Sequence, residues 1–133
     1  YLKTDLRLLE TLQSPYFLDF DQKDMGKRYL YVETSRGCPY GCAYCMASLD
    51  RKVRLFSQKY MDTFFDQLKE TDVKQVKFLD RTFNVEPKRA LRLGYQCLSM
   101  PESMHFHVEL VGDTLHEDLI HFFQNDALGY FSL

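Results

Sequence analysis

The chain has 133 residues, 45% of them hydrophobic and 27% charged, which gives one globular domain with its own core and too little length for two ordinary domains. Because 17 Lys and Arg residues and 19 Asp and Glu residues are mixed along the chain, with a formal net charge of -2, a nucleic-acid-binding function is disfavoured. No signal peptide or membrane-spanning stretch is visible, so we expect a cytoplasmic protein with no membrane association.

Strand and helix signals alternate from residue 28 onward. The aromatic and β-branched stretch 28–35 predicts a strand that runs into a loop at Gly37. The apolar residues that follow recur at helical spacing: Met61, Phe64, Phe65 and Leu68. Residues 73–80 then have the composition of a second strand.

The second half of the chain continues the alternation. Asn84 is expected to cap a helix with Pro87 in its first turn, although Gly94 weakens the helical pattern. In residues 105–111, apolar and polar residues alternate, which predicts a third strand with two different faces. One face carries Phe106, Val108 and Leu110, and the other carries His105, His107 and Glu109.

Two further signals complete the pattern. Thr114 and Glu117 have the spacing of a capping box before another helix, and residues 128–133 resemble the start of a fourth strand. The order is therefore β-α-β-α-β-α-β, which predicts an α/β fold with a parallel sheet, either doubly wound or part of a (β/α) barrel. Residues 1–27 are interpreted as an approach segment or linker, and the chain as a piece of a longer protein.

Three of the four cysteines, Cys38, Cys42 and Cys45, lie in one loop at the spacing C-x3-C-x2-C, whereas Cys97 lies apart. A structural zinc site normally has four ligands in two separated pairs, so here a fourth ligand would have to come from Cys97 or a histidine. A redox pair of Cys42 and Cys45 would leave Cys38 without a role. Three unligated core thiols fit poorly with a loop rich in glycine and proline.

Three thiolates can also hold a 4Fe-4S cluster by three of its irons and leave the fourth iron open to a substrate. The sequence therefore leaves several uses of the three thiols open. Among these uses, binding of a 4Fe-4S cluster gives a role to all three thiols.

The motif C-x3-C-x2-C, with Tyr44 before its last cysteine and a strand before its first, resembles that of the radical S-adenosylmethionine (SAM) enzymes. The resemblance implies that Cys38, Cys42 and Cys45 bind a 4Fe-4S cluster that reductively cleaves SAM to a 5'-deoxyadenosyl radical. It also implies an external electron donor, such as flavodoxin or ferredoxin, and a small-molecule substrate. Residues 28–133 would then form the N-terminal half of the core domain, about three and a half βα units of a barrel.

A narrower resemblance rests on "YVETSRGCPYGCAYC", "VKQVKFLDRTFN" and "KRALRL". These stretches are similar to the cobalamin-binding subgroup known as anaerobic magnesium-protoporphyrin monomethyl ester cyclase-like proteins. The resemblance implies cobalamin, bound by a domain outside this chain, and cyclase or methyltransferase chemistry. The alternative is a structural zinc or iron-sulfur domain without radical chemistry.

Three further residues are candidates for binding SAM. Tyr44 is placed by the resemblance beside the adenine. Asp80 ends the second strand, where many relatives have an acid that contacts the amino group of SAM, although it could instead cap the next loop. Glu109 is expected to face the interior of the barrel if Phe106 and Val108 face the helices, whereas the neighbouring histidines could simply be solvated.

The predicted half-barrel has exposed strand edges, which pair readily with other strands. We therefore expect the chain to associate with copies of itself.

Overall fold

The computed structural model describes residues 5–127 and 129–133, apart from the side chains of residues 20–22. Residues 1–4 of the predicted approach segment and Leu128 of the predicted last strand lie outside the described residues.

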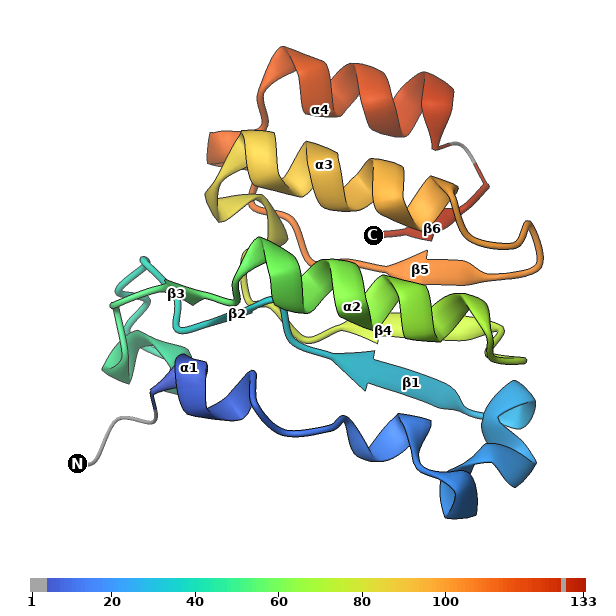
Figure 1. Ribbon diagram of the computed structural model, residues 1–133. Helices are drawn as coiled ribbons and strands as arrows, with labels where there is room; N and C mark the ends of the chain where they lie inside the picture. The colour runs from blue at the N-terminus through green and yellow to red at the C-terminus, as the bar shows by residue number, and fades with distance from the viewer. Residues whose placement is uncertain (1–4, 128) are drawn as a thin grey trace.

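Four parallel strands form the main sheet in the order β1-β4-β5-β6 (Figure 1). Their bounds are Tyr29–Val32 for β1, Gln75–Phe78 for β4, His105–His107 for β5 and Phe131–Ser132 for β6. The predicted α/β class with a parallel sheet is therefore confirmed. Within the described residues the sheet stays open and does not close into a barrel.

Four α-helices lie between or before the strands, and shorter helical turns occupy several loops. The α-helices are α1 (Leu6–Leu9), α2 (Gln58–Lys69), α3 (Pro87–Leu98) and α4 (Glu117–His121). The 3-10 segments are Pro15–Phe17, Asp19–Lys27, Met46–Leu49, Phe83–Val85 and Gly112–Thr114, of which Asp19–Lys27 is interrupted by a kink at Asp24. A π turn spans Phe122–Asp126. A separate antiparallel pair consists of β2 (Ser35–Arg36) and β3 (Arg54–Leu55).

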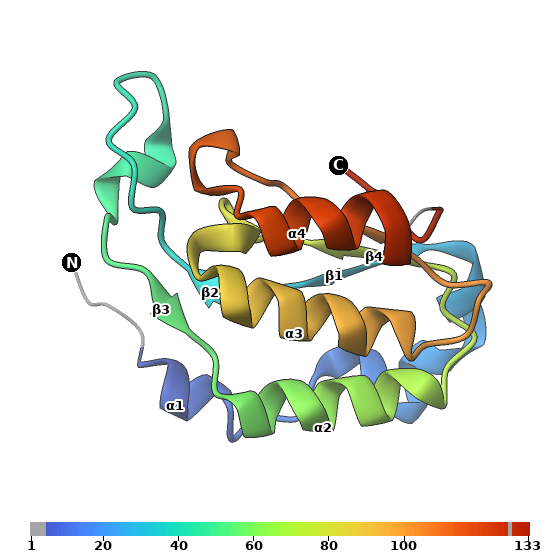
Figure 2. The same cartoon turned by 90° about the horizontal axis from the view of Figure 1, so that it is seen from above.

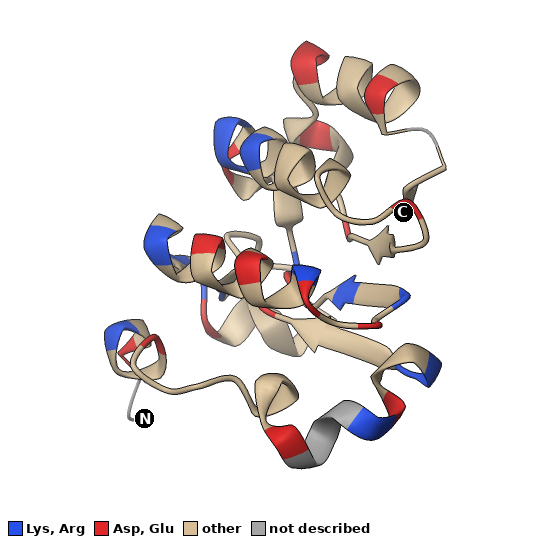
Figure 3. Ribbon diagram, turned by 45° about the vertical axis from the view of Figure 1, so that its right-hand side comes forward, with Lys and Arg blue, Asp and Glu red and all other residues tan. Residues whose placement is uncertain are grey.

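Helices α2, α3 and α4 lie along one face of the main sheet (Figure 2). Strand residues alternate between the two faces of a sheet, so every second side chain points toward these helices. Those side chains are apolar and buried: Leu30, Val32, Val76, Phe78 and Phe106. They pack against the predicted stripe of α2, whose four apolar residues are all buried. Acidic and basic residues are interspersed over the molecule (Figure 3).

The other face of the sheet carries polar and aromatic side chains that stay exposed or half-buried. They are Tyr29 and Tyr31 of β1, Gln75 and Lys77 of β4, and His105 and His107 of β5. The predicted alternation of the third strand is confirmed, because Phe106 and Val108 are buried while Glu109 is exposed. The hydrogen-bonded strand is shorter than predicted and ends at His107.

The two predicted helix caps are wrong. Helix α3 begins with Pro87, as predicted, but its N-cap residue is Glu86, and His116 precedes α4. The Asn84 side chain is instead buried and binds the loop after β5. Its Nδ2 donates to the Val111 carbonyl oxygen at 2.8 Å and to Thr114 Oγ1 at 2.9 Å, and its Oδ1 accepts from the Val111 N–H at 2.9 Å. Contacts between loops therefore replace local capping.

Gly94 lies in the buried face of α3, where the ring of Phe122 packs directly on its backbone. A Cβ atom at this position would lie 2.6 Å from Phe122 Cζ and 2.7 Å from its Cε1. The residue that weakens the helical pattern in the sequence thus allows α4 and its π turn to approach α3 closely.

Within the described part of the chain, no helix combines the length and the apolar character that crossing a membrane requires. The cellular compartment and the self-association of the chain stay predictions.

We predict that Gly94→Ala lowers the free energy of unfolding by about 1–2 kcal/mol. The clash with Phe122 costs up to about 3 kcal/mol, whereas the gain in helix propensity is about 1 kcal/mol. Chemical denaturation followed by circular dichroism measures the change. Gly112→Ala is the control, because no atom lies within 4 Å of the added Cβ, and a Gly94→Ala variant as stable as this control would contradict the packing described.

Candidate functional site

The carboxyl ends of β1 and β4 meet at one edge of the sheet, as in all parallel sheets, and this is the edge where such folds usually bind ligands. Thr34 and Ser35 follow β1, and Asp80 and Thr82 follow β4. All four residues are buried. The edge therefore contains a cluster of polar side chains withdrawn from water.

Asp80 is the centre of this cluster and is only 1% exposed. Its Oδ2 accepts a hydrogen bond from the Thr34 N–H at 2.9 Å. Its Oδ1 accepts from Thr34 Oγ1 at 2.7 Å and from Ser35 Oγ at 2.5 Å. Three donors thus bind a carboxylate that would otherwise be costly to bury.

Arg89 of α3 adds a positive charge from the helix layer, and it is 5% exposed. Its Nη1 donates to Thr34 Oγ1 at 2.9 Å, and its Nη2 donates to the Thr34 carbonyl oxygen at 2.7 Å. Thr34 therefore stands between the buried cation and the buried anion and is bonded to both. Sequence reasoning missed Arg89, although its position four residues before Leu93 on the buried stripe of α3 was a usable signal.

Burial dominates the electrostatics of the cluster. It raises the pKa of Asp80 above its ordinary value, while hydrogen bonds from Ser35 and Thr34 and the charge of Arg89 act in the opposite direction. Burial likewise lowers the pKa of Arg89, and the negative charge of Asp80 opposes that shift. The hydrogen bonds of Thr34 and the opposite charge of each partner thus offset part of the cost of burying Asp80 and Arg89.

The cysteine motif lies in a loop, residues 37–53, that projects from the carboxyl edge of the sheet (Figure 2). The pairing of β2 with β3 closes the base of this loop, and the Cys38 N–H donates to the Asp50 carbonyl oxygen at 3.1 Å. Gly37 has φ +97°, and a Cβ atom there would lie 2.5 Å from the Lys52 carbonyl oxygen. Only glycine fits this backbone conformation at so close an approach.

The four cysteines are free thiols in different environments. Cys38 is buried at the loop base, with its Sγ 3.9 Å from Thr82 Oγ1, whereas Cys42 and Cys45 are exposed farther along the loop. Cys97 is buried in α3, where burial raises the pKa of its thiol well above the ordinary value. Among the described residues, no three or more His, Cys, Asp or Glu side chains are grouped to hold a metal ion.

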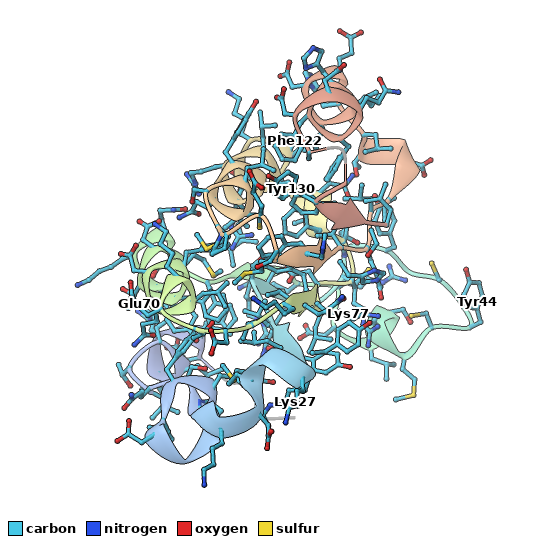
Figure 4. The ribbon with its side chains drawn as sticks, turned by 90° about the vertical axis from the view of Figure 1, so that its right-hand side faces the viewer. Lys27, Tyr44, Glu70, Lys77, Phe122 and Tyr130 are labelled. Carbon is cyan, nitrogen blue, oxygen red and sulfur yellow. The ribbon has the colours of Figure 1, made fainter. Side chains whose placement is uncertain are left out.

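The residues predicted to bind SAM are not brought together. Tyr44 is 93% exposed in the cysteine loop (Figure 4). Asp80 is buried and already accepts three hydrogen bonds. Glu109 is exposed beyond the end of β5, and its carbonyl oxygen accepts from the Phe83 N–H at 2.9 Å. The ligand roles of these three residues and of the three cysteines stay predictions.

The chain is similar to two curated proteins named as methyltransferases. It is 36% identical over 67 residues to an uncharacterized methyltransferase of Pyrococcus horikoshii, a match that covers 47% of this chain. It is 32% identical over 92 residues to the 2-(S-pantetheinyl)-carbapenam-3-carboxylate methyltransferase of Streptantibioticus cattleyicolor, which covers 62% of this chain. The matches span only 14% and 13% of the lengths of these relatives. No family model and no solved structure matches.

These comparisons correct the functional interpretation of the cysteine motif. The relatives are named methyltransferases, and neither name refers to a radical enzyme, a cyclase, an iron-sulfur cluster or cobalamin. The assignment to the radical SAM enzymes and to their cobalamin-binding, cyclase-like subgroup is therefore replaced by similarity to methyltransferases. The prediction of oxidoreductase chemistry with a 4Fe-4S cluster is wrong for the same reason. The alternative prediction of a structural metal domain is also wrong, because the described residues contain no metal-binding group.

We predict that the four thiols react with iodoacetamide in an order set by their exposure. Cys42 and Cys45 react first and Cys38 more slowly, whereas Cys97 stays unmodified in the folded chain because its thiol is buried and its thiolate is disfavoured. Peptide mass spectrometry at timed intervals measures each site. All four should react at similar rates in guanidinium chloride, and early modification of Cys97 without denaturant would refute the assignment of environments.

We predict that Asp80→Ala lowers the free energy of unfolding by about 3–5 kcal/mol at pH 7, because it leaves Arg89 as a buried charge without its counter-charge. Denaturant titration measures the loss. The matched control is Asp66→Ala, which removes a carboxylate that is 77% exposed and lies 3.6 Å from Lys69, so a change within about 0.5 kcal/mol is expected. Equal losses in the two variants would contradict the central role of Asp80.

Proposed function

We propose that this chain is part of a SAM-dependent methyltransferase. The observation that carries the proposal is its similarity to two proteins named as methyltransferases, one of them over 62% of the chain. In the proposed reaction, the methyl group of SAM passes to an acceptor and S-adenosylhomocysteine is released. The acceptor is proposed to be a small molecule, because one relative is named for a small-molecule substrate.

The fold supports a site on the open side of the sheet. The strands follow one another in chain order, and the helices between them lie on one face, so the opposite face and the carboxyl edge stay accessible. The cysteine loop projects on the open side, away from α2 (Figure 4). We propose that the chain supplies a segment of a (β/α) barrel, and the helices on one face of a parallel sheet in chain order support this proposal.

Two of the predicted SAM-binding residues have the exposure that direct contact requires. The ring of Tyr44 is free to stack on a planar base, and the carboxylate of Glu109 is free to accept hydrogen bonds from an amino group or a hydroxyl group. Asp80 is a positioning residue in this proposal. Its hydrogen bonds fix Thr34 and Ser35, which lead directly into the loop that carries Tyr44.

Isothermal titration of SAM into the purified protein tests the proposal. We expect saturable binding that Glu109→Gln weakens about tenfold, the equivalent of about 1.4 kcal/mol, because the variant keeps the shape of the side chain and removes its charge. Glu117→Gln is the matched control, since Glu117 is an exposed glutamate of α4 on the helix side of the sheet.

Absence of SAM binding at millimolar concentration would refute the proposed function. Equal weakening by the two glutamine variants would refute the role of Glu109.

A further inference from the structure

The open face of the sheet carries a row of side chains that runs across all four strands. Tyr31 of β1 is in register with Lys77 of β4, Lys77 with His107 of β5, and His107 with Ser132 of β6. Registered neighbours in a sheet lie about 4.8 Å apart and project from the same face. One ligand can therefore contact several of these side chains at once.

Lys77 is half-buried, and its cationic side chain has no ion-pair partner among the side chains that the structure describes. In residues 5–19, 23–127 and 129–133, no side chain forms an ion pair or a hydrogen bond with its ammonium group. The acidic residues beyond the ends of the neighbouring strands do not serve this purpose, because Glu33 pairs with Arg36 at 2.5 Å and Glu109 forms no ion pair with Lys77. A partly desolvated ammonium group of this kind favours an anion.

The histidines extend the row of polar groups next to Lys77. The His107 Nδ1 lies 3.1 Å from Ser132 Oγ, which fixes the ring beside Lys77. His105, in the adjacent row, has its Nδ1 3.2 Å from the Gly129 carbonyl oxygen, so that this nitrogen carries the proton. Both rings are thus held in place by groups on the β6 side of the sheet, and the Nε2 of each remains available to a ligand.

On the other side of Lys77, β1 presents two tyrosine rings. Tyr29 is 52% exposed and Tyr31 is 45% exposed, and their ring centroids are 6.2 Å apart with an interplanar angle of 37°. Exposed aromatic rings offer a flat apolar surface to a planar or cyclic ligand, with a hydroxyl group at the rim. Lys77 therefore lies between an aromatic surface and a polar one.

We propose that this face binds a cyclic compound that carries a carboxylate, with the carboxylate at Lys77 and His107 and the ring over Tyr29 and Tyr31. The inference rests on the proposed function, since this compound would be the methyl acceptor. The position agrees with that role, because Lys77 and the cysteine loop with Tyr44 lie on the same side of the sheet (Figure 4). The carboxylate supplies the charge that Lys77 lacks.

Titration of benzoate into the isotopically labelled protein, in the absence of SAM, tests the proposal by NMR. We expect saturable shifts of the Lys77 ε-methylene and His107 ring signals with benzoate, and none with benzyl alcohol, which has the ring without the charge. Acetate, which has the charge without the ring, should bind at least fivefold more weakly.

Lys77→Met should weaken benzoate binding about tenfold. His107→Gln should weaken it by a smaller factor, which measures the contribution of His107 independently of Lys77. The matched control is Lys74→Met, which removes the same charge from an exposed lysine whose Nζ bonds Ser103 Oγ at 3.1 Å. It should bind benzoate like the unmodified chain. Circular dichroism verifies that each variant is folded.

Lack of saturation by benzoate at tens of millimolar, equal binding of benzyl alcohol, or equal effects of Lys74→Met and Lys77→Met would each overturn the proposal. Failure of the proposed function has a different signature. Benzoate would then bind at Lys77 while SAM does not bind to the protein.

Discussion

The buried link from Asp80 through Thr34 to Arg89 is the interaction on which the rest of the site depends. It joins two strands of the sheet to the helix layer, since Thr34 follows β1, Asp80 follows β4 and Arg89 belongs to α3. Burying two charges is costly, and the cost is offset only when each polar atom finds a partner. The arrangement therefore fixes the relative position of strand, loop and helix more sharply than apolar contacts alone.

The same link connects the core to the candidate site. Ser35 donates to Asp80 and also belongs to the short pair of strands that closes the cysteine loop. The orientation of the loop thus follows from a hydrogen bond made inside the protein. A second link, through Asn84, joins the loop after β4 to the loop after β5 and so places Glu109 relative to the same edge. Buried polar groups, rather than surface ones, position the exposed residues that are proposed to bind ligands.

Sequence periodicity was sufficient to predict the alternating strands and helices and the two faces of the third strand. In a strand every second residue is buried, and in a helix every third to fourth, so the spacing of apolar residues along the sequence indicates the type of element. It failed for Asn84 and Thr114, whose local spacing suggested helix caps. Those two side chains form a hydrogen bond between two loops, and contacts between distant segments produce no regular spacing of residues in the sequence. The periodicity of α3 indicates that Arg89 is buried, but it does not identify the partner Thr34, which is 55 residues away. The chemistry inferred from the cysteine spacing was corrected by similarity to named methyltransferases, because a spacing records which residues are close in sequence and not which reaction they serve.

The closed base of the cysteine loop allows the loop to change in sequence and length during evolution. The pairing of β2 with β3 and the tight turn at Gly37 hold the two ends of the loop together whatever lies between them. Once the ends are fixed, doubling the length of a flexible loop costs only about 0.6 kcal/mol of closure entropy. Insertions and substitutions between residues 40 and 49 can therefore accumulate without disturbing the sheet, so that proteins with this scaffold can diversify in what they bind while the buried framework stays unchanged.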